Sequence, residues 1–168
     1  TCYTTAQTGY EPWLVKFTSE HFLLGHQEGV CEAVYLSIAG QLRLQPPEWQ
    51  LLSADNKRWL ALKRFDVEPN QGRKHLLSVS AMLDADFRVP SLDYQDLIKV
   101  SGQLCRSPSA ARLLFRRMVF NLFACNQDDH SKNWAFLMAD NGQWQPAPFY
   151  DITYSPQPYN EHATSFGG

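Results

Sequence analysis

The sequence has 168 residues, with 15 Lys and Arg against 17 Asp and Glu, so its formal charge is −2 with His neutral. An apolar fraction of 44% argues against intrinsic disorder, and the length suits a single domain. No basic stripe gives a signal for direct nucleic-acid binding, and no apolar run is long enough to cross a membrane. The composition therefore predicts a soluble globular chain with no membrane partner.

The four cysteines are too widely spaced for a disulfide framework or a zinc site. Cys31 and Cys125 fall inside apolar stretches with helical spacing, where a reduced thiol in the core is the expected state. Reduced thiols predict a cytoplasmic protein. Because the chain starts at Thr1 without Met and stops on two glycines, we expect a piece of a longer protein, truncated at both ends.

The first 65 residues predict a strand, a helix and two paired strands, in that order. Apolar residues recur every three to four positions in the helix, and Gly40 near its end is typical of a stop signal. A polar turn at residues 54–57 separates the paired strands. The expected ranges are strand 13–17, helix 28–42, strand 50–52 and strand 59–65.

The later part of the chain changes to helical patterns and ends in a small hairpin. Ser107 and Pro108 are typical of a helix start, and the helix that they open is apolar nearly all round, which predicts a buried central helix. The dipeptide at 141–142, Asn-Gly, supplies positive φ angles for the hairpin turn. The expected ranges are helices 74–83, 94–104 and 108–124, then hairpin strands at 134–138 and 143–144. This order predicts an α+β chain with two unlike lobes.

The densest polar cluster is the loop at residues 126–133, which reads Asn-Gln-Asp-Asp-His-Ser-Lys-Asn. Taken alone, it is equally well interpreted as a solvated connection with Asx turns. However, Asn133 follows Asp128 by five residues, which is the spacing of a phosphotransferase loop whose Asp accepts the hydroxyl proton and whose Asn binds magnesium. Asp151 follows the hairpin, at the place of the second magnesium ligand in a kinase-type site.

Two charged residues of the first half complete this pattern. Lys16 interrupts an apolar strand, where a charge is costly without a partner, and Glu32 lies on the following helix. In kinases a strand lysine holds the ATP phosphates and a helix glutamate orients it. Each residue alone could as well be an edge-strand lysine or a solvent-facing glutamate. The joint order of lysine, glutamate, Asp-x4-Asn and Asp favours the kinase interpretation.

The loop motif N-x-D-x-H-x-x-N, with Asp151 placed 23 residues after Asp128, resembles the HipA family of serine/threonine kinases, the toxin kinases of bacterial toxin–antitoxin systems. The triplet Arg-Phe-Asp at 64–66 resembles the hinge of that family, and the runs at 150–155 and 161–164 also resemble its members. The resemblance implies a protein-kinase-like two-lobed core. Its small β-rich N-terminal lobe and hinge would span residues 1–66, and part of a mainly helical lobe would span residues 67–168.

The resemblance also implies a role for each matching residue. Asp128 would be the catalytic base, Lys132 would steady the charge of the transferring phosphoryl group, and Asn133 and Asp151 would bind Mg²⁺. The residues implied to hold ATP are Lys16, Glu32, Arg64, Phe65, Asp66 and His130. Lys63 stands where better-known members have an acidic residue, which a hinge contact through the backbone would tolerate.

The expected partners follow from the same resemblance. The protein substrate would be an aminoacyl-tRNA synthetase, and a HipB-like DNA-binding antitoxin would be the regulatory partner. Little of the phosphate-covering loop expected before Lys16 is present, so we expect weak binding of Mg-ATP by this fragment. Two alternatives stay open: a non-catalytic kinase-shaped module, such as a DNA-associated regulator, and a metal-dependent hydrolase built from Asp128, Asp129, His130 and Asp151.

Overall fold

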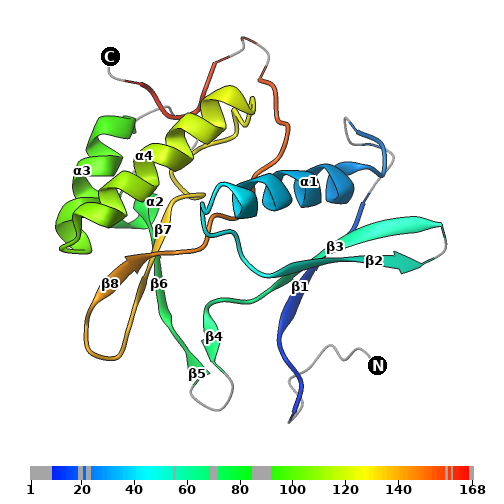
Figure 1. Cartoon of the computed structure of the whole chain (residues 1–168), viewed down its shortest axis with the longest axis horizontal. Coiled ribbons are helices and arrows are strands. Elements are labelled where there is room, and N and C mark those ends of the chain that lie inside the picture. Colours follow the sequence, from blue (N-terminus) through cyan, green and yellow to red (C-terminus); the bar gives the residue numbers. More distant parts are fainter. Residues whose placement is uncertain are drawn as a thin grey trace.

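The structure is a computed structural model that describes residues 9–18, 21, 24–54, 56–68, 72–84, 92–157, 159 and 161–166. Its elements form a sheet-and-helix part and a second part that joins helices to a small sheet (Figure 1). The first part contains β1 (Trp13–Lys16), α1 (Glu28–Gln41), β2 (Trp49–Ala54) and β3 (Lys57–Lys63). A short ribbon follows, β4 (Val67–Glu68) and β5 (Gly72–Arg73). The second part contains β6 (His75–Ser78), α2 (Val79–Met82), α3 (Tyr94–Leu104), α4 (Pro108–Phe123), β7 (Ala135–Met138) and β8 (Trp144–Pro146).

The first part is a three-stranded antiparallel sheet, in the order β1-β3-β2, with α1 packed against β3. The helix lies close to the sheet because Gly29 has no side chain: a Cβ atom there would lie 3.1 Å from the backbone nitrogen of Leu60. The predicted order of strand, helix, strand and strand is confirmed. Asn56 has the positive φ of the predicted turn, whereas Asp55 lies outside the described residues.

The second sheet corrects one sequence prediction. Residues 74–83 were expected to form one helix, but residues 75–78 form β6 and only one helical turn, α2, follows. The short apolar run suits either state, and pairing with β7, in which Leu77 faces Phe136, decides it in favour of a strand. The predicted hairpin is confirmed as β7 and β8, with a positive φ at Gly142 and none at Asn141.

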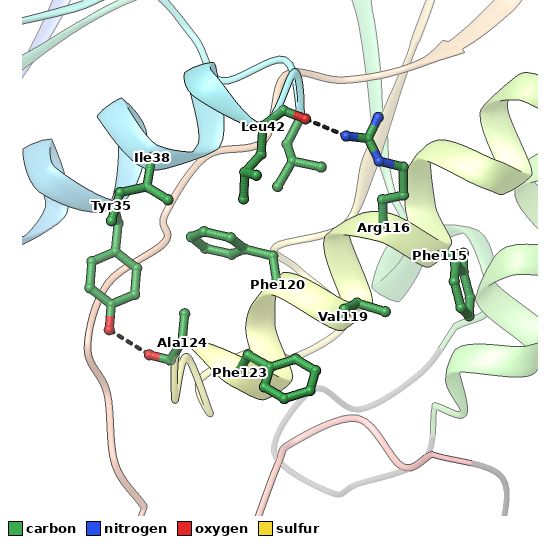
Figure 2. A pocket seen from close by; sticks show the side chains of 10 residues that line it. Tyr35, Ile38, Leu42, Phe115, Arg116, Val119, Phe120, Phe123 and Ala124 are labelled. Carbon is green, nitrogen blue, oxygen red and sulfur yellow. Dashed lines mark hydrogen bonds between the residues drawn. The ribbon is translucent and has the colours of Figure 1, made fainter.

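The two long helices pack against each other, and α4 begins at Pro108 as predicted. The prediction that α4 is buried all round is wrong. Phe120 lies in the core, but Phe115 is half exposed and Phe123 is 82% exposed. The exposed face of α4 and the C-terminal half of α1 border an apolar groove of about 590 Å³ (Figure 2). Hydrogen bonds from Tyr35 to the carbonyl of Ala124 and from Arg116 to that of Leu42 join the two helices across it.

The larger of two buried apolar clusters runs through both parts. Leu36 and Leu60 of the first part belong to the same buried cluster as Leu114, Phe136 and Phe149 of the second. Arg117 on α4 is buried beside this cluster and donates to the carbonyls of Leu44 and Ala147 at 3.0 and 2.9 Å. Burial lowers the pKa of this guanidinium. Arg117 of α4 therefore holds the segment that follows α1 and the segment that follows β8.

The burial of the cysteines differs from the sequence prediction. Cys105 is buried, but Cys125 is exposed directly after α4 and Cys31 is half buried, so the prediction of two core thiols at Cys31 and Cys125 is wrong. These three cysteines are free thiols, and Cys2 lies outside the described residues. Among the helices that the structure describes, each is too short or too polar to cross a membrane.

Candidate active site

Lys16 lies where three elements that are far apart in the sequence meet. Its ammonium on β1 donates to both carboxylate oxygens of Glu32, at 2.9 and 2.8 Å, and to Oδ1 of Asp151 at 2.7 Å. Glu32 comes from α1, and Asp151 follows β8. One lysine therefore joins the first sheet and its helix to the chain that leaves the second sheet. The structure brings together three of the side chains that the sequence singled out.

The two ion pairs of Lys16 differ in their exposure to water. Glu32 is 6% exposed, and burial raises the pKa of its carboxyl, which the charge of Lys16 only partly offsets. Burial alone would lower the pKa of Lys16, but Glu32 and Asp151 outweigh it and raise that pKa, so the ammonium stays protonated at neutral pH. The side chain of Asp151 is 47% exposed, and its backbone takes a left-handed φ of 56°.

The loop at residues 126–133 lies beside the segment that carries Asp151. Tyr150 donates its hydroxyl to the carbonyl of Lys132 at 2.8 Å, and the backbone nitrogen of Asp128 donates to Oγ of Ser155 at 3.1 Å. The sequence marked residues 150–155 by resemblance but gave no role to Tyr150 or Ser155, because a hydroxyl that binds a backbone atom follows no spacing rule. These two hydrogen bonds hold the loop next to Asp151, the second magnesium ligand predicted from the sequence.

The loop presents polar side chains on its outer side. The Asp128 side chain is 51% exposed, so its carboxylate is open to an incoming hydroxyl, and Nε2 of His130 lies 3.7 Å from Oδ1 of Asp128. Asn133 donates its amide nitrogen to the carbonyl of Asp128 at 2.9 Å, which leaves its amide oxygen for a cation. Mg²⁺ prefers carboxylate and amide oxygens and takes few protein ligands when phosphates complete its shell. The amide oxygen of Asn133 and the carboxylate of Asp151 are both oxygen donors of the type that magnesium prefers.

Asp129 belongs to the interior instead. Its side chain is fully buried and accepts hydrogen bonds from the hydroxyl of Tyr94 at 2.6 Å and from Nδ1 of His162 at 2.9 Å. In the described part of the chain, no three His, Cys, Asp or Glu side chains are grouped as metal ligands. The hydrolase alternative needed Asp129 as a ligand, so this geometry argues against it.

The hinge triplet lies between the two parts of the molecule. Arg64 donates Nε to Oδ1 of Asp66 at 3.0 Å, and this hydrogen bond holds the pKa of the Asp66 carboxyl below its ordinary value. The ring of Phe65 packs 5.5 Å from that of Tyr150, so the triplet adjoins the segment that carries the exposed carboxylate. The side chain of Lys63 makes ion pairs with Glu11 and Glu48, and its backbone nitrogen donates to the carbonyl of Glu48 at 2.9 Å.

Two solved structures share this fold. HipA of Shewanella oneidensis, solved in complex with HipB and its operator DNA, superposes with a TM-score of 0.74 at 21% identity, covering 90% of this chain and 40% of that one. The proinflammatory kinase CtkA of Helicobacter pylori superposes with a TM-score of 0.65 at 24% identity, covering 88% of this chain and 53% of that one. The α+β, kinase-like two-lobed architecture predicted from the sequence is confirmed.

Sequence comparison leads to the same group of proteins. The serine/threonine-protein kinase toxin HipA of Shewanella oneidensis is 25% identical over an alignment of 161 positions, which covers 83% of this chain and 36% of the relative. The chain thus spans little more than a third of the length of that relative. Residues 2–168 match the HipA-like C-terminal domain. Because that match extends over nearly the whole sequence, the chain belongs to the family of HipA-like C-terminal domains.

Proposed function

We propose that this chain carries the active site of an ATP-dependent serine/threonine protein kinase of the HipA type. The observation that supports it best is the ammonium of Lys16, which is held between the buried Glu32 of α1 and the exposed Asp151. A strand lysine fixed by a helix glutamate, facing an aspartate that follows a hairpin, is the constellation that positions ATP phosphates in protein kinases.

Each residue has a chemical task in this proposal. Mg-ATP supplies the γ-phosphoryl group, and the metal neutralises charge on the phosphate oxygens. Lys16 binds the phosphates while Glu32 orients it, and Asn133 and Asp151 hold the metal. Asp128 accepts the proton of the serine or threonine hydroxyl as the oxygen attacks phosphorus in line with the leaving oxygen of ADP. Lys132 steadies the charge of the transferring phosphoryl group, and the remaining nucleotide contacts come from Arg64, Phe65, Asp66 and His130.

The domain boundary and the partners belong to the same proposal. Residues 1–66 would hold the nucleotide and residues 67–168 the base and the metal. The substrate would be a protein hydroxyl, with aminoacyl-tRNA synthetases as the first class to test, in the cytoplasm. The solved Shewanella oneidensis HipA is bound to HipB and operator DNA, which supports a HipB-like antitoxin as partner.

A labelling experiment distinguishes this function from its rivals. The full-length protein is incubated with radiolabelled ATP and Mg²⁺ in cell extract, beside an Asp128→Asn variant. A kinase transfers label to a protein serine or threonine, and the variant loses that transfer. Release of phosphate without labelled protein would indicate a hydrolase. Absence of both labelling and nucleotide binding would indicate a non-catalytic module and refute the proposal.

A further inference from the structure

Whereas the neighbouring Asp128 is half exposed, Asp129 is buried and accepts several hydrogen bonds. Its Oδ2 accepts from the Tyr94 hydroxyl at 2.6 Å and from Nδ1 of His162 at 2.9 Å, and its Oδ1 accepts from the backbone nitrogen of Thr164 at 3.1 Å. Its carbonyl accepts from the Trp134 indole at 3.0 Å and from the Thr164 hydroxyl at 2.6 Å. The carboxylate is satisfied from two separate segments, α3 and residues 161–166, and Trp134 adds a contact to the carbonyl from a third.

The same network reaches the backbone of Asp128 along a second path. Asn121 of α4 donates to the Tyr94 hydroxyl at 3.0 Å, and Asn126 donates to Oδ1 of Asn121 at 2.9 Å. Ser155 donates to Oδ1 of Asn126 at 3.1 Å, and its oxygen accepts from the backbone nitrogen of Asp128 at 3.1 Å. A continuous line of hydrogen bonds therefore links α3 and α4 to the residue that faces the substrate hydroxyl.

The segment at residues 161–166 closes this arrangement from outside the loop. Besides the contacts of His162 and Thr164, the backbone nitrogen of Ala163 donates to the carbonyl of Gln127 at 3.1 Å. The ring of His162 stands perpendicular to that of Phe166 at 4.8 Å. Since a carboxylate only accepts hydrogen bonds, Nδ1 of His162 carries the proton that it shares with Asp129.

Neighbouring residues of the loop thus face opposite ways. The Asp128 side chain is 51% exposed, whereas that of Asp129 is fully buried. Because the two share a peptide unit, a rotation of Asp129 in its socket moves the Asp128 carboxylate. A misplacement of about 1 Å in a reacting group costs on the order of a hundredfold in rate.

We infer that Asp129, His162 and Tyr94 are positioning residues of the phosphotransfer reaction, which hold Asp128 at the distance that proton transfer needs. This inference rests on the kinase function proposed above. It assigns a role in catalysis to the segment at residues 161–166, which follows Asp151 in the sequence and binds the buried carboxylate of Asp129.

The test compares two substitutions of one residue in the full-length protein. His162→Phe keeps a ring against Phe166 and removes the donor, whereas His162→Asn keeps a donor near the place of Nδ1. Ser101→Ala is the control, because it removes a buried hydroxyl of α3 whose partner is the carbonyl of Ile98. We expect kcat of His162→Phe to fall about tenfold or more, with KM and Kd for Mg-ATP changed less than twofold. His162→Asn should recover most of the loss.

A second readout does not depend on activity. Amide hydrogen exchange of residues 127–133 should become faster in His162→Phe and stay as in the parent in Ser101→Ala. If His162→Phe folds too poorly, Thr164→Val removes only the hydroxyl that binds the Asp129 carbonyl and should show the same pattern. Unchanged kcat and exchange in His162→Phe would overturn the inference, as would equal losses in Ser101→Ala. If the parent protein transfers no phosphate, the kinase function is refuted. The exchange data would still show whether His162 holds the loop at residues 127–133 in place.

Discussion

The ammonium of Lys16 is the residue-scale feature on which the site depends. Glu32 is almost fully buried and makes an ion pair with Lys16. Without Lys16, the Glu32 carboxylate would remain unpaired in an apolar interior, which is strongly unfavourable. Asp151 makes the same contact from a half-exposed position, where an ion pair contributes little to stability. The buried partner therefore governs folding, and the exposed one is available for ligands.

Lys16→Met should destabilise the protein by about 2 kcal/mol at neutral pH, because Glu32 loses its partner. Burial already raises the pKa of Glu32, and loss of the cation raises it further. A carboxyl whose folded-state pKa is raised costs stability as pH rises through that value, so the deficit should be larger at pH 8 than at pH 5. Urea unfolding at both pH values measures it.

The double variant Lys16→Met with Glu32→Gln should recover part of the lost stability and abolish the pH dependence. Lys63→Met serves as the matched control, since Lys63 forms its ion pairs at the surface. A Lys16→Met deficit that is equal at pH 5 and pH 8 would contradict this account of Glu32.

Cys105 and Cys125 should react very differently with an alkylating reagent. Burial raises the pKa of Cys105 to about 11, so at pH 8 about one molecule in a thousand carries the reactive thiolate there, in a site closed to reagent. Cys125 is exposed. Iodoacetamide followed by peptide mass spectrometry should label Cys125 first and Cys105 only on unfolding. Equal labelling rates in the folded protein would disprove the prediction.

At the scale of elements, the close approach of α1 to β3 sets the distance between Glu32 and Lys16. Gly29, in the first turn of α1, lies against the backbone of Leu60, and a Cβ atom there would lie 3.1 Å from the Leu60 nitrogen, closer than an ordinary van der Waals contact. Gly40 lies inside the last turn of the same helix, not at the stop that the sequence suggested, and the nearest atom to its Cβ position is 3.9 Å away.

Gly29→Ala and Gly40→Ala should therefore change stability in opposite directions. Alanine favours a helix over glycine by about 1 kcal/mol, so Gly40→Ala should stabilise the protein by up to that amount. Gly29→Ala gains the same helix propensity, but its methyl group pushes α1 away from the sheet. We therefore expect a net loss of stability of about 1 kcal/mol or more. Thermal unfolding compares the two. A rise in Tm for Gly29→Ala would show that the contact with Leu60 yields easily.

Most elements could be predicted from local sequence, and the errors have a common physical cause. The strand–helix–strand pattern and the start of α4 follow from periodicity and capping residues close to them. The strand β6 depends on β7, some sixty residues later, and no local pattern reports such a partner. The exposed apolar face of α4 was mistaken for a buried one, because composition does not tell which neighbour covers a helix.

Part of the candidate site could be predicted from the sequence. The order of Lys16, Glu32 and Asp151 along the chain led to the expectation that they meet, and the structure places them in contact. The roles of Asp128 and Asn133 stay predictions. The residues that support the loop could not be predicted, because Tyr94, Asn121 and His162 share neither a spacing nor a motif. They meet only through tertiary contacts.

At the scale of the whole molecule, Arg117 ties the two lobes together from within the shared core. Arg117→Met would leave the carbonyls of Leu44 and Ala147 without donors, so we expect a loss of about 2 kcal/mol. Arg112→Met, on the exposed side of the same helix, should change stability by less than about 0.5 kcal/mol. Guanidinium unfolding, followed by far-UV circular dichroism and by tryptophan fluorescence, measures both variants.

Because one core serves both lobes, the parent protein should give coincident curves with the two probes. Separate transitions in the parent would show that the lobes unfold independently. No loss of stability in Arg117→Met would mean that water replaces the guanidinium at the two carbonyls.

The left-handed backbone at Asp151 has a practical consequence. Glycine adopts that conformation with less strain than aspartate, and the half-exposed ion pair lost with the carboxylate is worth little. Asp151→Gly should therefore yield an intact molecule. If the proposed kinase function holds, this molecule would lack phosphotransfer but keep the surfaces that bind its protein substrate, and it could be used to capture that substrate without phosphorylating it.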